Sequence, residues 1–417
     1  MEKRKKIILV GGGFAGLQLA QKLNKTEFDV LLIDKQNHHQ FQPLYYQVAS
    51  ARLEPSNISF PFRKIFQKSN NIEIRLAEVL RIVSEENKIE TTIGEFKYDY
   101  LVIATGCKTN FFGNEEISKY ALSMKTTEEA IEIRNRILLN FEKIISLSDS
   151  EKDALLNIVL VGAGPTGVEL AGAFAEMKKD ILPRDYPNID FTKLNIILLE
   201  GSKNTLNNMS VESKNASKKY LEELGVIIRT ETFVTSYNGK VAILNTGESI
   251  ETLNLIWAAG VTGNIIEGIK IENIIRNRYK VDRFNKILGT NNIYAIGDIS
   301  YMETPLYPNG HPQLANVAIN QGKNLATNFL NIIKGRKENE YEYKDLGSMA
   351  TIGKYRAVVD LPFIKFQGLF AWYIWMFLHL MLILSIRNKL SIFFNWAWSY
   401  LAKDSSLRLI LKQKKEN

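Results

Sequence analysis

The sequence predicts an α/β fold with two Rossmann-like dinucleotide-binding domains and a C-terminal helical region that associates with a membrane. The main observation is a pair of glycine motifs, residues 11–16 and 162–167, each placed between a short apolar run and a helix-like segment. One G-x-G-x-x-G motif is weak evidence, because glycine clusters also mark ordinary turns, whereas two in this context are strong evidence. A tryptophan-rich tail is the second observation. Two dinucleotides in one chain imply electron transfer between them.

The first domain begins with a strand, a glycine turn, a helix and a second strand. The helix is predicted over 16–23, and the apolar run 30–33 is typical of a buried parallel strand. That strand ends at Asp34, 18 residues after Gly16. A carboxylate at this position can accept hydrogen bonds from both hydroxyls of an adenosine ribose.

Two further strands of the first domain come much later in the chain, at 101–106 and 293–298. We therefore expect a discontinuous domain, residues 1–119 and 286–340, with the second glycine motif inserted inside it. Asp298 ends the last of these strands, where it could hydrogen-bond the ribityl or phosphate region of a large dinucleotide.

The inserted domain, residues 120–285, carries the second motif and a strand that ends at Glu200. Glu200 follows the motif by 33 residues, because the polar, proline-bearing stretch 177–191 is predicted to be a loop extension. A negative Glu200 would repel a 2′-phosphate, which favours NADH over NADPH. Arg184 and Lys203 are near in sequence and leave that preference open.

The composition is that of an ordinary globular protein whose positive charge gathers at its two ends. The 417 residues suffice for two or three domains, and the net charge is +8. The basic clusters are Lys3-Arg4-Lys5-Lys6 and, near the other end, Arg408, Lys412, Lys414 and Lys415. They are either solvated ends or a means of attraction to anionic lipid, worth about 1 kcal/mol per basic residue. Nucleic acid is disfavoured, because no aromatic–basic platform accompanies the charge.

The first residues and the cysteine count restrict the compartment and the chemistry. Only four apolar residues lie between the basic start and the first glycine, too few for a secretion signal, so we expect a protein that faces the cytoplasm. Cys107 is the single cysteine, in agreement with a reducing compartment. A flavoenzyme that passes electrons through a cysteine pair is thereby excluded. No metal site is predicted.

Several segments together identify a family resemblance. They are Ala104-Thr105-Gly106, Trp257-Ala258-Ala259-Gly260, Ala295-Ile296-Gly297-Asp298 and residues 41–49, 164–172 and 395–401. Nearly the whole chain resembles the type II NADH dehydrogenases, which are non-proton-pumping NADH:quinone oxidoreductases of the two-dinucleotide flavoprotein superfamily. The resemblance implies non-covalent FAD in the first domain and NADH in the second. It also implies a membrane quinone, menaquinone or ubiquinone, reduced on the opposite side of the flavin.

The resemblance assigns residues to both nucleotide sites. FAD would be held by Gly11, Gly13, Phe14, Ala15, Gly16, Asp34, Lys35, Val79, Ala104, Thr105, Gly106, Gly297, Asp298, Gln313, Leu314 and Ala315. NADH would be held by Gly162, Gly164, Pro165, Thr166, Gly167, Glu169, Glu200, Ala259, Gly260 and Val261. Ala259 and Gly260 would lie beside the nicotinamide.

Three residues are candidates for the catalytic side of the flavin. The resemblance places Glu169 near the nicotinamide and quinone, as a polar link or proton relay; the alternative is a carboxylate favoured by a helix N-terminus. The family usually has glutamine at two positions where this chain has Asn316 and Asn320. Asparagine is one methylene shorter, so the reach to a quinone carbonyl should change. The alternative is that both asparagines merely cap or line a helix.

The last fifty residues contain four of the five tryptophans and an uncharged stretch, 368–386, if His379 is neutral. This stretch is close to the roughly 20 residues that span a bilayer, but it is equally typical of a buried or dimer helix, or of an interfacial anchor. Basic residues flank it on both sides, so no inside–outside bias supports a span. The next segment favours the anchor, because it has a polar stripe amid aromatic residues at helical spacing. The stripe consists of Asn388, Ser391, Asn395 and Ser399.

The predicted protein is therefore a monotopic NADH:quinone oxidoreductase on the cytoplasmic face of the cell membrane, at the entry to a respiratory chain. Tyr45, Tyr46 and Ile352 are candidates for a quinone tunnel, although such residues are more often plain core. Homodimerisation is a family expectation. Sulfide:quinone reductases need more than one cysteine and are excluded. Two alternatives remain: a reductase with a soluble acceptor such as ferredoxin, which needs no anchor, and an NADH-sensing flavoprotein of the apoptosis-inducing-factor type.

Overall fold

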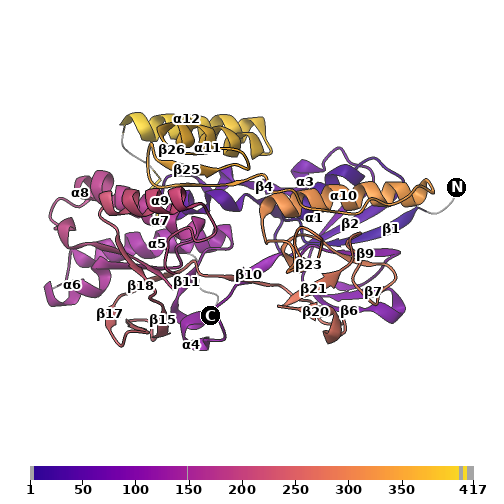
Figure 1. The fold of residues 1–417 in the computed structure, drawn as a ribbon, viewed down its shortest axis with the longest axis horizontal. Coiled ribbons are helices and arrows are strands. Elements are labelled where there is room, and N and C mark those ends of the chain that lie inside the picture. Colours follow the sequence, from indigo (N-terminus) through magenta and orange to yellow (C-terminus); the bar gives the residue numbers. More distant parts are fainter. Residues whose placement is uncertain (1–3, 148, 403–406, 411–417) are drawn as a thin grey trace. The chain divides into compact units, whose positions relative to one another are not determined.

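A computed structural model describes residues 4–147, 149–402 and 407–410, and the chain folds into two compact units. The first unit consists of the described residues within Met1–Gln40, Phe60–Lys108 and Val261–Asp345. The second consists of those within Phe41–Ser59, Thr109–Gly260 and Leu346–Asn417. Each unit is built around its own five-stranded parallel sheet (Figure 1).

The first unit contains a parallel sheet with helices on one face and, on the other, a small antiparallel sheet and a small mixed sheet. Its elements are β1 (Lys5–Val10), α1 (Phe14–Leu23), β2 (Phe28–Asp34), β3 (His38–Gln40), α3 (Phe62–Ile65), β5 (Ile72–Leu76), β6 (Val79–Val83), β7 (Lys88–Thr91), β8 (Gly94–Lys97), β9 (Tyr100–Ile103), β20 (Ile274–Ile275), β21 (Arg278–Val281), β22 (Ile293–Ala295), β23 (Ser300–Met302) and α10 (Ala315–Ile333). The strand order is β22-β9-β1-β2-β5, so β22, the last strand of this sheet in the sequence, pairs with β9 and completes the discontinuous sheet.

Alternating residues of β1 serve two hydrophobic clusters. Ile7 and Leu9 pack toward α1 and α10, while Ile8 and Val10 pack toward β6, β7 and β21. A strand that is buried on both faces has a continuous apolar sequence, so this strand could be predicted. Figure 1 shows α1 and α10 side by side along this sheet.

The second unit repeats this plan and adds the C-terminal segment. Its elements are α2 (Tyr45–Ala49), α4 (Glu115–Tyr120), β11 (Leu122–Ser123), α5 (Thr127–Ile144), α6 (Asp149–Leu156), β12 (Asn157–Val161), α7 (Pro165–Glu176), α8 (Leu182–Asp185), β13 (Asn195–Glu200), α9 (Val211–Glu223), β14 (Ile227–Thr230), β15 (Val234–Tyr237), β16 (Val241–Leu244), β17 (Ser249–Glu251), β18 (Asn254–Trp257), β24 (Ser348–Thr351), β25 (Ala357–Asp360), β26 (Lys365–Gly368), α11 (Leu369–Leu382) and α12 (Ile386–Ala402). The parallel sheet has the order β11-β18-β12-β13-β14, and β15-β16-β17 form an antiparallel sheet. The chain passes between the units after Gln40, within β4 (Ser59–Pro61), within β10 (Cys107–Thr109), just before β19 (Val261–Gly263) and after Asp345.

The C-terminal segment is an antiparallel sheet, β24-β25-β26, followed by α11 and α12 (Figure 1). The uncharged stretch 368–386 is not one helix, because α11 ends at Leu382 and Ile383 is extended. Lys389 Nζ donates a hydrogen bond of 3.0 Å to the carbonyl oxygen of Met381, which caps the end of α11. Among the described residues, no helix has the length and apolarity needed to cross a membrane.

The boundaries of the compact units differ from the predicted ones. Residues 41–59 lie in the second unit, because the buried helix α2 packs against α5 and α7. Residues 261–285 lie in the first unit, where β21 pairs with β23. The C-terminal segment packs within the second unit, where α7 contacts β24 and α9 contacts β25 and β26.

The stretch 177–191 is not simply a loop, contrary to prediction. A π-helical turn, Met177–Ile181, continues α7 into α8, and Met177, Ile181 and Leu182 are buried. Pro183 is tolerated because it occupies the first turn of α8. Basic residues at the start of the chain have partners: Arg4 pairs with Asp29 and Lys5 with Asp99. Lys3, Lys412, Lys414 and Lys415 lie outside the described residues.

Candidate functional site

The first glycine motif forms a tight turn between β1 and α1. Gly11 has a φ of +100°, which favours glycine, and a Cβ on Gly16 would lie 1.9 Å from the carbonyl oxygen of Gly11. Gly13 is different, because no described heavy atom beyond its chain neighbours lies within 4 Å of its Cβ position. The backbone of this turn is therefore open on the side where a pyrophosphate would approach, and α1 begins without a side-chain cap.

The second motif has the same geometry in the second unit. Gly162 has a φ of +100°, and a Cβ on Gly167 would lie 1.9 Å from the carbonyl oxygen of Gly162. The Cβ position of Gly164 is open among the described residues, as at Gly13. Pro165 and Thr166 are exposed at the uncapped start of α7. Both turns therefore have the open backbone that the pyrophosphate of a dinucleotide requires.

A carboxylate at the end of the second strand is bound to each glycine turn. Asp34 Oδ2 accepts a hydrogen bond of 2.6 Å from the N–H of Gly12, and Oδ1 accepts one of 2.7 Å from Gln36. Glu200 Oε2 accepts one of 2.6 Å from the N–H of Ala163. Burial raises the pKa of Asp34 above its ordinary value, and the two N–H donors oppose this rise. Both carboxylates lie at the position where the ribose of a dinucleotide is recognised.

The other predicted FAD ligands in the first unit surround its sheet end. Thr105 Oγ1 donates to the carbonyl oxygen of Asn264 at 2.7 Å, and Gly106 has a φ of +66°. Cys107 Sγ donates to Asp298 Oδ2 at 3.0 Å. A Cβ on Gly11 would lie 2.4 Å from the carbonyl oxygen of Ala104. Glycine at this position therefore lets the residues that follow β9 approach the turn closely.

Gln321 belongs to this site, although the sequence analysis did not single it out. Its Oε1 accepts hydrogen bonds from the N–H of Gly297 at 2.7 Å and from Ser300 Oγ at 3.0 Å. The Gln321 side chain is fully buried, and its Nε2 has no partner among the described residues. Gln313 Nε2 donates to the carbonyl oxygen of Asp298 at 3.0 Å. The two glutamines fix the 297–300 turn from α10 and from the segment before it.

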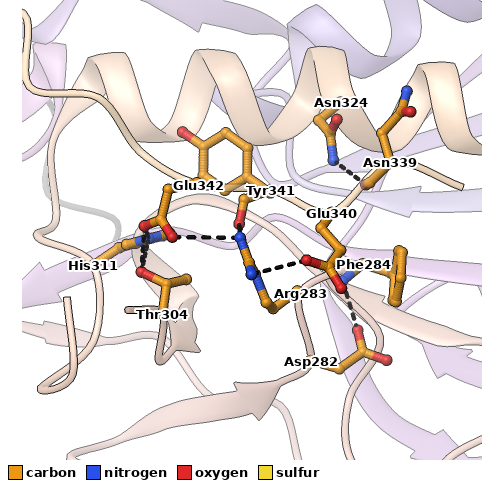
Figure 2. Close-up of polar contacts among 10 residues, drawn as sticks. All are labelled: Asp282, Arg283, Phe284, Thr304, His311, Asn324, Asn339, Glu340, Tyr341 and Glu342. Atoms are coloured by element: carbon orange, nitrogen blue, oxygen red, sulfur yellow. Dashed lines mark hydrogen bonds and ion pairs between the residues drawn. The ribbon is translucent and has the colours of Figure 1, made fainter. Parts of the chain in front are cut away.

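A polar network holds the segment that leads into α10 (Figure 2). Arg283 pairs with Glu340 at 2.8 Å and with Glu342 at 3.3 Å. Thr304 Oγ1 donates to Glu342 at 2.5 Å and lies 3.2 Å from Nε2 of the buried His311. Burial lowers the pKa of His311, so this imidazole is neutral near pH 7. Gln313, Leu314 and Ala315 follow directly, so this network positions the predicted FAD ligands at the start of α10.

The remaining predicted residues have varied surroundings. Lys35 pairs with Glu78 at the surface, and Val79 is buried at the start of β6. Asn316 and Asn320 lie one turn apart on α10, half-buried, and neither side-chain amide has a hydrogen-bond partner among the described residues.

The NADH set is divided between the units. A Cβ on Gly162 would lie 2.8 Å from the backbone of Ala259, so β18 ends against the turn. Gly260 is exposed, with a φ of +74°. Val261 belongs to the first unit and the rest of the set to the second.

Glu169 is buried on α7, the helix that begins at the second glycine turn. The residue is 8% exposed, and its carboxyl group accepts a hydrogen bond of 3.4 Å from the N–H of Thr351. Burial raises the pKa of Glu169 to about 8, and the hydrogen bond from the N–H of Thr351 only partly opposes this rise. A carboxyl group with this pKa is protonated at neutral pH and can release a proton near it, which is the property of a general acid.

A small cavity lies beside Glu169 in the second unit. Its volume is about 20 Å³, enough for one water molecule. Among its lining residues are Tyr46, Thr351, Gln47, Trp396 and Tyr400. Tyr45 and Ile352 are buried but do not line it.

A buried ion pair closes the same region. Arg52 Nη2 lies 2.5 Å from Glu176 Oε2, and both side chains are almost inaccessible. Glu176 also accepts a hydrogen bond from the N–H of Lys354, whose Nζ donates to the carbonyl oxygen of Ser399 at 3.2 Å. The ion pair thus links α7 to residues 41–59, to the C-terminal sheet and to α12. Arg52, Glu176 and Lys354 were not predicted, because their partners are far away in the sequence, and Ser399 was predicted only as part of the polar stripe.

Comparison with known proteins agrees with this geometry. A family model described as pyridine nucleotide-disulphide oxidoreductase matches residues 5–322, and one described as NDH2 C-terminal domain matches residues 346–403. The type II NADH:quinone oxidoreductase Ndh of Mycobacterium tuberculosis is 32% identical, over 96% of this chain and 89% of the relative. That of Staphylococcus haemolyticus is 29% identical, over 86% of this chain and 90% of the relative.

The fold itself is that of a solved relative. The structure of NDH2 from Plasmodium falciparum in complex with NADH superposes with a TM-score of 0.91 at 23% identity, covering 98% of this chain and 100% of the other. The matched sequences extend over nearly all of the molecule. They include both glycine turns, the Asp34 and Glu200 carboxylates and the C-terminal segment. The chain therefore belongs to the type II NADH:quinone oxidoreductases, enzymes of the pyridine nucleotide-disulphide oxidoreductase family.

Proposed function

We propose that this enzyme binds NADH at the 162–167 turn and FAD at the 11–16 turn, and delivers two electrons to a membrane quinone without pumping protons. The observation that carries the proposal is α7, which begins at the proposed NADH turn and places the buried Glu169 beside the C-terminal helices. FAD, when bound, supplies hydride acceptance from NADH and electron donation to quinone. The proposed NADH turn and the carboxyl group proposed to act on the quinone thus both belong to α7.

The first turn suits FAD through its open backbone at Gly13, the Asp34 carboxylate and the Asp298 turn fixed by Gln321. The second turn suits NADH, because Glu200 presents a negative charge where NADPH carries a 2′-phosphate. Lys203 is exposed three residues beyond Glu200, which leaves NADPH as a competitor to be measured. Ala259 and Gly260 would adjoin the nicotinamide.

We propose that Glu169 supplies a proton to the reduced quinone. Quinone reduction consumes two electrons and two protons, whereas NADH supplies a hydride, so one further proton must come from the medium. The protonated Glu169 carboxyl, with a pKa of about 8, can donate that proton and be reprotonated from solvent. Asn316 and Asn320 are the proposed amide contacts to the quinone from the first unit.

The proposed membrane surface is the outer side of α11 and α12, together with the β25–β26 turn. Its large apolar side chains are at least about half exposed, more than scattered surface residues require. They include Phe363, Phe370, Tyr373, Phe377, Leu382, Leu390, Phe394 and Trp398. The polar stripe of α12 lies on the other side, where Asn388 Nδ2 donates to the carbonyl oxygens of Ser56 and Asn57. This arrangement supports peripheral attachment to one leaflet, on the cytoplasmic side where NADH is present.

The proposal is tested with the holoenzyme in detergent. The released flavin is identified as FAD or FMN, and NADH oxidation is measured with and without short-chain ubiquinone and menaquinone analogues. We expect FAD and a large acceleration by at least one quinone. Absence of acceleration by both would overturn the proposal and favour a soluble acceptor or a sensing role.

The role of Glu169 is tested by rapid mixing. Glu169→Gln should slow quinone-dependent reoxidation of the flavin by roughly 100-fold, the scale of general acid catalysis. Flavin reduction by NADH should change much less. Glu116→Gln, an exposed glutamate on α4, is the matched control.

A further inference from the structure

Trp396 of α12 and Glu169 of α7 are connected through three intermediate residues, the last of which contacts Glu169 through its backbone N–H. Trp396 Nε1 donates to Gln47 Oε1 at 2.7 Å, and Gln47 Nε2 donates to Tyr46 Oη at 3.0 Å. Tyr46 Oη lies 3.1 Å from Thr351 Oγ1, and the N–H of Thr351 donates to Glu169. All five residues are buried and line the same small cavity.

The indole determines which way the Gln47 amide faces. An indole N–H can only donate a hydrogen bond, so the atom of Gln47 that faces Trp396 must be the carbonyl oxygen. The amide NH₂ group therefore faces Tyr46. Without the Trp396 donor, nothing in this chain distinguishes the two orientations of the amide.

The orientation of Gln47 decides how many hydroxyl protons remain for the cavity. Tyr46 and Thr351 have one hydroxyl proton each, and one of these makes the bond between them. Because Gln47 supplies its own proton to Tyr46, the second hydroxyl proton stays available. If the Gln47 amide were reversed, its carbonyl oxygen would accept the hydroxyl proton of Tyr46. The hydrogen bond between the two hydroxyls would then use the hydroxyl proton of Thr351. No hydroxyl donor would then face the Glu169 cavity.

We propose that Gln47 is a positioning residue: the Trp396 indole holds it in the orientation that leaves the Tyr46–Thr351 pair a spare hydroxyl donor toward Glu169, so that the position of α12 sets the protonation state of the Glu169 carboxyl. The inference rests on the proposed role of Glu169 in quinone reduction. A donor favours the ionised carboxylate, so its loss makes Glu169 harder to deprotonate.

Few other charged groups act on Glu169. Arg52 lines the cavity but is paired with Glu176. Tyr400 of α12 lines the cavity too, and burial raises its pKa, so it stays neutral. On α11, His379 stacks on Trp375 with ring centroids 3.9 Å apart, and burial lowers its pKa to about 4, so it is also neutral. The Tyr46–Thr351 pair is therefore the adjustable group beside Glu169.

The test is a pH titration of Glu169 in the resting holoenzyme without quinone. The carbonyl stretching band of the protonated carboxyl is followed by infrared spectroscopy and assigned by its loss in Glu169→Gln. Trp396→Phe keeps an aromatic ring but removes the indole donor. We therefore expect the midpoint of the Glu169 titration to rise by about one pH unit. Gln47→Leu should leave it near its original position, because one hydroxyl proton remains spare. Trp398→Phe on the exposed side of α12 is the control for the titration.

A second set of variants leaves α12 untouched. Tyr46→Phe combined with Thr351→Val removes both hydroxyls and should raise the titration as Trp396→Phe does, whereas either single variant retains one donor and should not. The inference is overturned if Gln47→Leu shifts Glu169 as much as Trp396→Phe, which is the result expected of simple packing damage. It is also overturned if Trp396→Phe and the double variant both leave the titration unchanged. Unimpaired quinone turnover in Glu169→Gln would instead refute only the proposed function.

Discussion

Glu200 Oε2 accepts a hydrogen bond of 2.6 Å from the N–H of Ala163, so the carboxylate that ends β13 is bound to the glycine turn that follows β12. Its other oxygen accepts a hydrogen bond of 2.8 Å from the N–H of Ser202. The carboxylate is thus held in place before any nucleotide arrives. Asp34 and Gly12 form the equivalent pair in the first unit.

Glu200→Ser should therefore weaken NADH use and relax discrimination against NADPH. Serine cannot accept both backbone bonds and carries no negative charge. Loss of charge-assisted hydrogen bonds predicts a fall in kcat/KM for NADH of roughly 10- to 100-fold, with a smaller fall or a rise for NADPH. Steady-state kinetics with both nucleotides measure this ratio. Glu251→Ser, an exposed site on β17, is the control; a wild-type enzyme that already uses both nucleotides equally would contradict the argument.

Gly13→Ala and Gly164→Ala should fold normally and yet each lose one nucleotide. Both Cβ positions are open among the described residues and neither glycine has a positive φ, so the substitutions strain nothing in the protein. The added methyl group would occupy the side on which a pyrophosphate approaches. We expect Gly13→Ala to be purified without flavin, and Gly164→Ala to retain flavin while its KM for NADH rises at least tenfold. Each variant controls for the other.

The pH dependence of stability should show the buried carboxyl of Glu169. Its folded-state pKa is raised to about 8 from the ordinary glutamate value of 4.5, so the folded state holds a proton that the unfolded state loses above pH 4.5. Each pH unit between these values lowers the stability of the wild type by up to about 1.4 kcal/mol relative to Glu169→Gln. Thermal unfolding of both holoenzymes at pH 5, 7 and 9 should show that the stability of Glu169→Gln rises relative to that of the wild type as the pH rises. A constant difference would indicate an ordinary carboxylate.

Trp398→Ser and Phe394→Ser should release the enzyme from membranes without destabilising it. The two side chains are 65% and 64% exposed, so little packing is lost. Burial of a large apolar side chain in lipid is worth about 1.5–3 kcal/mol, which predicts roughly 10- to 150-fold weaker vesicle binding for each substitution. Co-sedimentation with anionic vesicles measures this. Ile271→Ser, 87% exposed in the first unit, should bind as the wild type does.

The nucleotide turns could be predicted from sequence because they are local. A strand, a glycine turn and a helix follow one another directly, and the Asp34 and Glu200 carboxylates end the next strand of each parallel sheet. The alternation that buries both faces of β1 is likewise visible in its apolar run. These elements needed no information about distant partners.

The surroundings of Glu169 could not be predicted in the same way. Gln47 and Trp396 are 349 residues apart, and no periodicity connects them. The end of α11 at Leu382 has no proline or glycine to announce it; it depends on Lys389 capping the Met381 carbonyl. Gln321 stood next to Asn320 but had no motif of its own, and only its contacts with Gly297 and Ser300 reveal its position.

The second unit is assembled from three separate parts of the chain, and this has a consequence for biosynthesis. Residues 41–59 leave the ribosome long before Trp396. A nascent chain that has completed both glycine turns still lacks α11 and α12 over Glu169 and the Arg52–Glu176 pair. We expect the apolar surface beneath these helices to stay uncovered until both helices have been synthesised, so that the C-terminal segment would close the second unit and present the lipid-facing side chains at the same moment.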